Sequence, residues 1–374
     1  MGHSYVVAEN RRLAHEMALA GGGRWQVTAI APSHLRGDLR RIDLEPIPHE
    51  ACAVVPLEMA FDRSAHLMWF RGLRRALSAG ADVVHAWEEP YVHAGMQIAR
   101  SSPPSARVVF ATFQNISKHY PWPFSAFERA SIRRASGWIA FGHRVVDALG
   151  DREGYDGKPM RVIPPGVDVE RFRPDPEAGA AIRAHIGWSD HALVVGYLGR
   201  FEPQKGVTDL IAALERARAP WHALFVGGGS LQRDIEAFGA AHPGRVHVAG
   251  GVPHSDVPRW LNAMTILCAP SRTTAAWREQ FGRMLIEAMA CGVPTLVSDS
   301  GEMPAVVHDA GRVLPERDPV PWATSIDNHL RDARTLAALS KRGVERARAY
   351  FAWPVVAKRH LDFFDALVDG RATP

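Results

Sequence analysis

Two cationic side chains lie in one loop, directly after an apolar run of the chain. Gly199 ends the run, and Arg200 and Lys205 follow before a segment with helical spacing begins near Val207. Backbone N–H groups at a helix start, together with Arg and Lys, attract anions such as a diphosphate. Lys205 is followed by Gly206 and not by Ser or Thr, so the segment is not a P-loop. Taken alone, such side chains are more often simply solvated.

Three glycines and a serine, Gly227–Ser230, follow the next apolar run. Glycines at this place allow a phosphate or a sugar to approach the backbone closely. The run does not match the dinucleotide fingerprint G-x-G-x-x-G, because the third glycine would fall on Gln232. A plain turn is an equally good interpretation of these glycines alone, but two such loops after consecutive strands favour a common binding site.

Two glutamates flank the start of a further helical segment. A loop of small and polar residues begins at Ser271 and ends near Glu279, and the helix expected from Gly282 carries Glu287 among apolar side chains. A carboxylate in apolar surroundings needs hydroxyl or amide donors, and sugar hydroxyls are suitable. The alternative is an Arg283–Glu287 ion pair on a solvent-facing side of the helix.

Short apolar runs alternate with helical segments along most of the chain, which predicts parallel sheets covered by helices on both faces. We expect strands over Gln26–Ile30, Ala51–Pro56, Val83–Ala86, Val108–Phe113 and Gly137–Phe141, then Val194–Leu198, Ala223–Val226, Val246–Ala249, Thr265–Ala269 and Thr295–Val297. We expect helices around Asn10–Ala20, His66–Ser78, Tyr91–Arg100 and Pro123–Ala135, then Val207–Ala217, Leu231–Ala241, Ser255–Met264, Arg283–Ala290 and Met303–Val307.

The length of 374 residues suits two domains of ~150–190 residues each. Two prolines and a glycine in the segment Ile163–Asp168 indicate the join. We therefore expect an N-terminal domain over 1–168, a second domain over 169–350 and a final helix within 351–374. In open α/β sheets ligands bind beyond the carboxyl ends of the strands, where the loops described above would lie.

Composition excludes several classes of protein. Lys and Arg total 44 against 40 Asp and Glu, a net charge of +4, with no basic cluster typical of nucleic-acid binding. Cys52, Cys268 and Cys291 lie in apolar stretches and are expected to be reduced core thiols. No apolar run is long enough to span a membrane, and no signal peptide is evident at the start. A cytoplasmic protein is expected.

The motifs appear in an order that resembles the retaining GT-B glycosyltransferases of family 4 (glycosyl transferases group 1). They are Gly199–Gly206, Val226–Ser230, Glu279–Glu287, Cys291–Pro294 and Ser298–Gly301, preceded by Ile163–Asp168, which resembles the interdomain segment. The resemblance implies two Rossmann-like doubly wound domains facing a cleft, with a C-terminal helix that crosses back to the N-domain. It also implies retaining transfer of a hexose from a nucleotide-diphosphate sugar, with UDP or GDP, to a sugar, lipid-linked or small-molecule acceptor, in polysaccharide or glycolipid biosynthesis.

The resemblance assigns catalytic roles to Arg200 and Lys205 on the diphosphate and to Glu279 on the transferred sugar. Donor-binding residues would be Gly199, Gly228, Gly229, Val252, His254, Ser271, Phe281, Gly282, Arg283 and Glu287, with Glu287 on the ribose and the Val252–His254 stretch near the base. Arg200 and Lys205 supply positive charge, and the chain has no D-x-D motif. We therefore expect neither a metal ion nor a cofactor.

The acceptor side would lie in the first half, where Glu88, Glu89, Gln114, Asn115 and His119 follow strands. The family often has a histidine at the position of Gln114, and a glutamine cannot act as a general base. The family also opens with a complete strand and a glycine-rich loop. Only Gly2 precedes Tyr5–Ala8 here, so the first strand is expected to be short or missing.

Other functions remain open at this point. A scaffold that binds a nucleotide sugar without turnover, or a sugar-phosphate synthase or phosphorylase-like enzyme, would share the fold. Arginines recur on the helices around Arg71–Arg75 and Arg129–Arg134. Solvated faces are the default interpretation, and peripheral contact with anionic lipids at the inner membrane face is the alternative.

Overall fold

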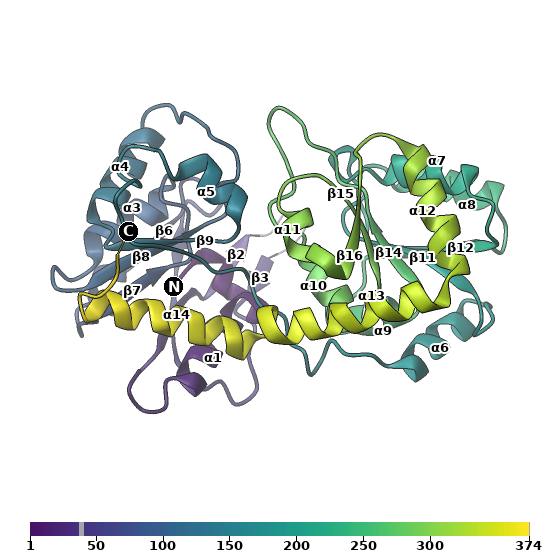
Figure 1. Cartoon of the computed structure of the whole chain (residues 1–374). Coiled ribbons are helices and arrows are strands. Elements are labelled where there is room, and N and C mark those ends of the chain that lie inside the picture. The colour runs from purple at the N-terminus through teal and green to yellow at the C-terminus, as the bar shows by residue number, and fades with distance from the viewer. Residues whose placement is uncertain (37–40, 374) are drawn as a thin grey trace. The chain divides into compact units, whose positions relative to one another are not determined.

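The computed structural model describes residues 1–36 and 41–373. The chain forms two compact units (Figure 1), which we call unit 1 (Met1–Pro165 with Trp353–Pro374) and unit 2 (Gly166–Ala352). The chain thus enters unit 2 after Pro165 and leaves it after Ala352, whereas the sequence places these crossings at 168 and 350.

Unit 1 combines short strands with helices that alternate along the chain. Its strands are β1 (Thr28–Pro32), β2 (His34–Arg36), β3 (Arg41–Asp43), β4 (Ala53–Leu57), β5 (Met59–Ala60), β6 (Trp69–Phe70), β7 (Val83–Ala86), β8 (Arg107–Thr112), β9 (Gly137–Ala140) and β10 (Met160–Val162). Its helices are η1 (His3–Val6), α1 (Ala8–Ala20), α2 (Leu73–Ala76), α3 (His93–Ser101), α4 (Phe124–Arg134), α5 (His143–Leu149) and α14 (Trp353–Val368).

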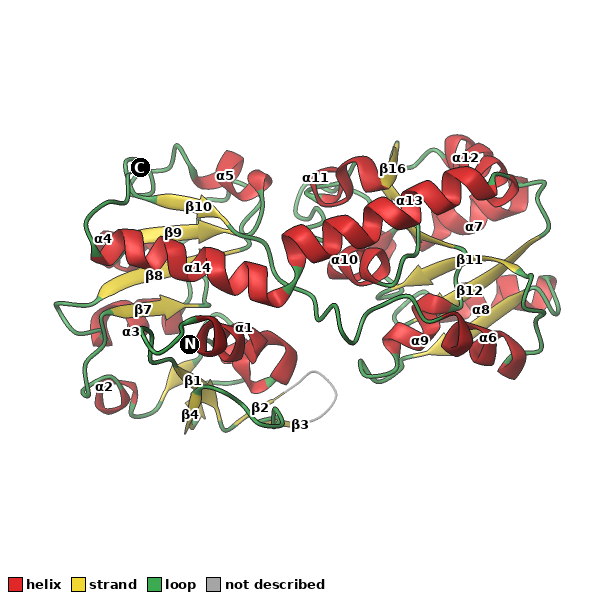
Figure 2. Cartoon of the chain, turned by 60° about the horizontal axis from the view of Figure 1, so that its bottom comes forward, coloured by secondary structure: helices red, strands yellow, loops and turns green. Residues whose placement is uncertain are grey.

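The main sheet of unit 1 is parallel, in the order β10-β9-β8-β7. Successive side chains of β8 alternate between its faces. Val109 and Ala111 pack in one core with α1 and α14, and Val108 and Phe110 pack in another core with α3. Figure 2 shows α14 lying across β8 and β9. The final helix therefore packs on unit 1, as the resemblance to family 4 implies.

The N-terminal residues of unit 1 form a turn of 3-10 helix, η1, where we expected a short strand or none. The Met1 carbonyl accepts a hydrogen bond from Trp87 N, which directly follows β7. A Cβ on Gly2 would lie 2.4 Å from the Trp87 carbonyl oxygen, so glycine is required for this approach. Among the described residues, β1 pairs with β4 in a separate parallel sheet.

The helix expected over His66–Ser78 is wrong for its first half. Trp69–Phe70 forms strand β6, paired with β5, and only Leu73–Ala76 is helical. The Gln97 side-chain amide accepts from Phe70 N at 2.8 Å and donates to Phe70 O at 2.7 Å, which holds this backbone extended. Gly72, at φ +79, then separates strand from helix.

Unit 2 has the same alternating rhythm. Its strands are β11 (Leu193–Leu198), β12 (Trp221–Val226), β13 (Val246–Gly250), β14 (Ile266–Ala269), β15 (Thr295–Ser298) and β16 (Gly311–Leu314). Its helices are α6 (Pro176–His185), η2 (Pro203–Lys205), α7 (Val207–Arg216), α8 (Gln232–Ala241), α9 (Val257–Asn262), α10 (Arg283–Ala290), α11 (Met303–Val307), η3 (His308–Ala310), α12 (Pro319–Arg331), α13 (Ala333–Arg346) and η4 (Ala347–Phe351).

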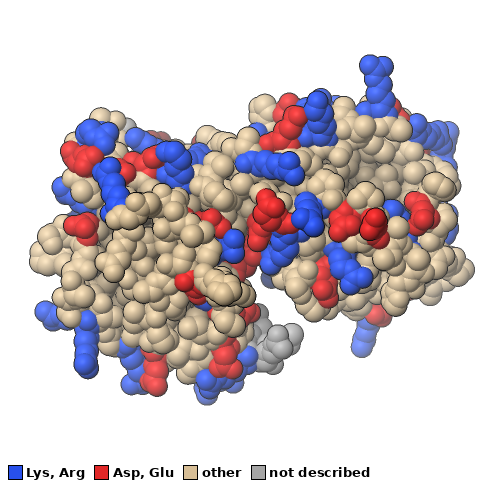
Figure 3. Space-filling model, turned by 90° about the horizontal axis from the view of Figure 1, so that it is seen from below, with Lys and Arg blue, Asp and Glu red and all other residues tan. Residues whose placement is uncertain are grey.

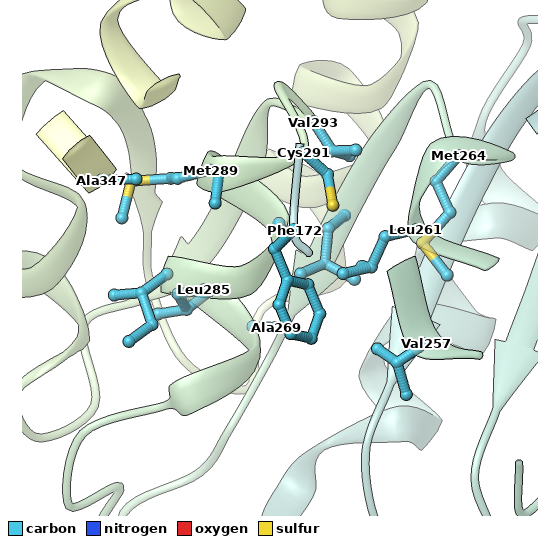
Figure 4. Close-up of a cluster of buried hydrophobic side chains, with 14 of the residues drawn as sticks. Phe172, Val257, Leu261, Met264, Ala269, Leu285, Met289, Cys291, Val293 and Ala347 are labelled. Atoms are coloured by element: carbon cyan, nitrogen blue, oxygen red, sulfur yellow. The ribbon is translucent and has the colours of Figure 1, made fainter. Parts of the chain in front are cut away.

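All strands of the unit 2 sheet run parallel, in the order β13-β12-β11-β14-β15-β16. One face packs on α9, α10 and α11, and the other packs on α7, α8 and α12. Figure 4 shows part of the first core, where Phe172 lies among Ala269, Leu261 and Cys291. This covering on both faces makes unit 2 a doubly wound parallel sheet.

Charged side chains of both signs are interspersed on the face of unit 2 seen in Figure 3.

Cys52, Cys268 and Cys291 are buried free thiols, and burial raises the pKa of Cys52 to about 11. Within the described ranges, every helix is too short or too polar to cross a bilayer.

Candidate active site

The order of strands in unit 2 creates a natural binding position. From β11 the chain moves outward to β12 and β13, and it then returns to β14 on the other side of β11. The loops after β11 and β14 therefore diverge from a switch point, the usual ligand position in such sheets. Gly206 and Pro270 touch there, since a Cβ on Gly206 would lie 1.8 Å from the Pro270 carbonyl oxygen.

Lys205 and Glu279 form an ion pair at this switch point. The Lys205 Nζ lies 2.7 Å from Glu279 Oε2, and the Ser271 hydroxyl donates to the same oxygen at 2.9 Å. Only 16% of the Lys205 side chain and 8% of the Glu279 side chain are exposed. Sequence-predicted residues of two different loops, the one after β11 and the one between β14 and α10, thus converge.

Trp277 covers the same lysine, with its ring centroid 4.8 Å from Lys205 Nζ. A tight turn fixes the indole, because Thr274 N donates to Trp277 O at 2.7 Å and Trp277 N donates to Thr274 Oγ1 at 3.0 Å. The cation–π contact adds a second attraction on the lysine. Sequence analysis missed Trp277, and its position two residues before Glu279 was the available signal.

The glycine loop after β12 packs directly on the loop that carries Arg200. Phe201 N donates to Gly228 O at 2.8 Å. A Cβ on Gly229 would lie 2.6 Å from the Phe201 carbonyl oxygen, so the two loops can approach only through glycine. Arg200 is exposed beside them. Gly199 adopts φ +152, a conformation available to glycine.

Glu202 also joins these loops. Its carboxylate accepts from Ser230 N at 3.2 Å and from Ser230 Oγ at 2.8 Å. These hydrogen bonds lower the pKa of the Glu202 carboxyl. Glu202 thus ties the loop that carries Arg200 to the glycine loop after β12. No feature of the sequence pointed to this pairing.

Glu287 is buried on α10 and bonds to a histidine from another loop. The His254 Nε2 lies 2.9 Å from Glu287 Oε1, and Arg171 lies 3.0 Å from His254 Nδ1. The ring of His254 packs on Phe172, with centroids 5.6 Å apart. The proposed solvent-facing pair with Arg283 is therefore not the environment of this carboxylate. Arg171, in the segment after the domain join, was not anticipated.

The remaining residues predicted to bind the donor differ in whether their side chain or their backbone is accessible to a ligand. The Phe281 side chain belongs to the core and packs edge-on to Phe351 at 5.9 Å, so a ligand could meet only its backbone. Gly282 caps the start of α10 at φ +82, and Arg283 follows it as the first helical residue. Val252 is half-buried beyond β13, in the loop that carries His254.

The acceptor-side candidates of unit 1 do not form one cluster. Glu89 accepts from Thr112 Oγ1 at 2.6 Å and from Gln114 Nε2 at 3.1 Å, and burial raises the pKa of the Glu89 carboxyl. Glu88 bonds instead to His3, whose Nδ1 lies 2.8 Å away. Asn115 is buried beside Gln114 in the sequence, and His119 is exposed.

Tyr120 extends the Glu89 group, since its hydroxyl donates to Gln114 Oε1 at 2.8 Å. Its ring stacks on Tyr91 with centroids 3.9 Å apart. The sequence analysis did not single out either tyrosine. Over the described ranges, no group of three or more His, Cys, Asp or Glu has an arrangement suited to a metal ion.

Comparison with known proteins identifies the family. Residues 192–332 match the model of glycosyl transferases group 1, and residues 11–171 match that of glycosyltransferase family 4. The lipopolysaccharide core biosynthesis mannosyltransferase LpsB of Rhizobium meliloti is 30% identical over 262 residues, which cover 65% of this chain and 72% of that protein. This chain belongs to glycosyltransferase family 4.

A second relative is the GDP-mannose-dependent alpha-(1-6)-phosphatidylinositol monomannoside mannosyltransferase of Mycolicibacterium smegmatis. It is 37% identical over 202 residues, covering 51% of this chain and 52% of the relative. The chain spans about half the length of the first curated relatives that it matches.

A solved structure supports the fold of this family 4 member. The Anabaena HepE protein in complex with UDP superposes with a TM-score of 0.70 at 18% identity, covering 94% of this chain and 96% of that one. The GT-B fold expected from the sequence is therefore confirmed.

Proposed function

We propose that this family 4 member is a retaining glycosyltransferase that moves a hexose from a nucleotide-diphosphate sugar to a sugar, lipid-linked or small-molecule acceptor. The observation that carries the proposal is the ion pair of Lys205 with Glu279 at the switch point of unit 2. GDP-mannose is the first donor to test, because the Mycolicibacterium relative is GDP-mannose-dependent and the Rhizobium relative is also a mannosyltransferase.

In this proposal Lys205 and Arg200 stabilise the departing diphosphate. Negative charge grows on the phosphate as the bond to the sugar breaks, and fixed cations stabilise that charge. The bound diphosphate offers Lys205 a second anionic partner. Glu279 can then accept hydrogen bonds from hydroxyls of the transferred sugar, with Ser271 holding its Oε2 atom in place.

Glu287 is the proposed partner of the ribose hydroxyls. Its carboxylate already has one donor, His254, which orients it from the loop after β13. The backbone of Gly228 and Gly229 lies near the diphosphate in this arrangement. Val252 lies in the loop that would approach the base.

The transfer step proceeds on one face of the sugar. The anomeric carbon–phosphate oxygen bond breaks and a bond from the acceptor oxygen forms on the same side, while the departing phosphate takes the acceptor proton. This route needs no general base at Gln114, whose amide cannot accept that proton at neutral pH. We propose that the hydrogen-bonded group of Glu89, Gln114 and Tyr120 lines the acceptor-binding side of the site.

We propose that the reaction is independent of metal ions, since Arg200 and Lys205 supply the positive charge. Reduced, buried thiols support a cytoplasmic location.

Release of nucleoside diphosphate from GDP-, UDP- and ADP-sugars, with and without candidate acceptors, tests the proposal. Lys205→Ala and Arg200→Ala should each lower kcat/KM by about 100-fold or more. Glu287→Gln should mainly raise the donor KM. NMR of the product should show retained anomeric configuration, and activity should survive EDTA. Donor binding without turnover on any acceptor would favour a binding scaffold instead, and full activity of Lys205→Ala would refute the diphosphate role.

A further inference from the structure

Unit 1 carries exposed apolar side chains on two loops, one between β5 and β6 and one just before α4. Trp122 is 81% exposed, Phe61 is 67% exposed and Leu67 is 42% exposed. A group of exposed apolar side chains on one surface marks an interaction site more often than single exposed ones do. We call Phe61, His66, Leu67, Tyr120, Trp122 and Phe124 the aromatic ridge.

Ring contacts join the two loops of the aromatic ridge into one surface. His66 packs edge-on to Phe124 with centroids 5.6 Å apart, and it also lies 5.7 Å from Tyr91. Tyr91 in turn stacks on Tyr120. Figure 1 shows α3 beside α4, and the ring of His93 on α3 stacks on Phe127 of α4 at 5.2 Å. The loops around Phe61 and Trp122 are therefore held together by neighbouring rings.

Local backbone features restrict the conformation of both loops. Pro121 and Pro123 flank Trp122 and restrict the loop on both sides. Phe61 has φ +58, a left-handed conformation that is strained for a bulky residue and that the turn nevertheless maintains. The Phe61 carbonyl accepts from Ser64 N at 3.3 Å, which closes this turn.

Exposed cations accompany the aromatic ridge on both loops. Arg63 lies between Phe61 and His66, and Lys118 lies just before Tyr120. Glu128, an acidic side chain of α4, is buried and paired with Arg152 at 3.0 Å, so its charge is already balanced. Aromatic rings suit the boundary between headgroups and acyl chains, and cations attract anionic lipids.

We infer that the aromatic ridge docks this protein on an anionic lipid surface, with Trp122 inserted at the headgroup level. A membrane fits better than a protein partner, because the loops that carry the exposed rings also carry the exposed cations Arg63 and Lys118. The inference locates a surface for the lipid-linked acceptors of the proposed function, and the docking itself needs neither donor nor acceptor.

Vesicle sedimentation with the full chain tests the inference. Vesicles of phosphatidylcholine mixed with phosphatidylglycerol should bind the protein more tightly than vesicles of phosphatidylcholine alone. Trp122→Ala should reduce the partition coefficient about tenfold. Arg63→Glu with Lys118→Glu should abolish the preference for the anionic vesicles. Leu19→Ala is the matched control, because Leu19 is 58% exposed on α1 of the same unit.

The outcomes separate docking from catalysis and from other partners. Trp122→Ala should melt like the parent protein, since its side chain is exposed, and Lys205→Ala should bind vesicles normally. Equal vesicle binding by Trp122→Ala and Leu19→Ala would overturn the inference. So would the absence of vesicle binding together with a change of oligomeric state in Trp122→Ala, which would assign the ridge to protein contact.

Discussion

Lys205 donates a hydrogen bond to Glu279 over 2.7 Å, although 74 residues separate them along the chain. Both side chains are largely buried, so each provides a neutralising charge for the other. Replacing one partner of a buried ion pair by a neutral residue leaves the other charge uncompensated, which lowers the free energy of unfolding.

Lys205→Met, Glu279→Gln and the double variant should therefore give strongly non-additive stabilities in urea unfolding. We expect a coupling free energy of about 1–3 kcal/mol, because each buried side chain loses an opposite charge when the other is changed. Lys358 and Asp362 supply a matched control pair, with side chains 71% and 60% exposed. Their cycle should give only about 0.3–0.5 kcal/mol. Equal couplings in the two cycles would contradict a special role for the buried pair.

Trp277 should matter for donor binding through Lys205. Removing the ring in Trp277→Ala takes away a contact of about 0.5–2 kcal/mol and should weaken GDP binding about two- to thirtyfold. Trp277→Phe should keep most of the affinity, since a ring remains. Calorimetric titration with GDP measures both variants, and a melting curve checks folding. An unchanged affinity in Trp277→Ala would remove the indole from the site.

Gly206→Ala should destabilise unit 2 for two reasons. Its φ of +67 is unfavourable for alanine, and the new Cβ would lie 1.8 Å from the Pro270 carbonyl oxygen. Gly187 is a matched control, because it has φ +80 with nothing within 4 Å of the added Cβ. We expect about 1–2 kcal/mol for Gly187→Ala, from strain alone, and clearly more for Gly206→Ala. If both variants lost the same free energy of unfolding in urea, the backbone near Pro270 would have to move away from the new Cβ at no cost, and the close contact would not explain the glycine.

His3 should make unit 1 more stable at low pH. The Glu88 carboxylate raises the pKa of His3 above its usual 6.5, so the folded protein holds this proton more tightly than the unfolded chain. The added stability is complete below pH 6.5 and disappears as the pH rises through the folded-state pKa. The melting temperature of the parent minus that of His3→Gln should therefore shrink with rising pH. Exposed His191→Gln serves as the control, and a constant difference would contradict the assignment.

The spacing of the motifs predicted much of unit 2, because strand periodicity and glycine turns are local properties. Glu279, Lys205 and Ser271 were all named from loops that follow strands. Their pairing was not visible, since it depends on the strand order that brings β14 beside β11. The sequence placed Glu287 among apolar side chains of a helix, but its bond to His254 arises between elements distant in sequence.

Unit 1 was harder to predict for a similar reason. The apolar pattern near Trp69 suits a helix, yet the Gln97 amide holds Phe70 in a strand from across the unit. A hydrogen bond from a buried side-chain amide to a distant backbone segment does not change the hydrophobic periodicity from which secondary structure is predicted. The exposed Trp122 likewise looked like any other aromatic residue, because exposure depends on tertiary packing.

The return of the chain after Ala352 has a consequence for biosynthesis. Unit 2 is one continuous segment, whereas the core of unit 1 contains α14 residues such as Trp353 and Phe364. During synthesis every residue of unit 2 is therefore made before α14, so unit 1 lacks part of its core until this helix is made. Folding would then run against the usual order in which the amino-terminal domain matures first, leaving α1 and the sheet beneath it to await the final helix.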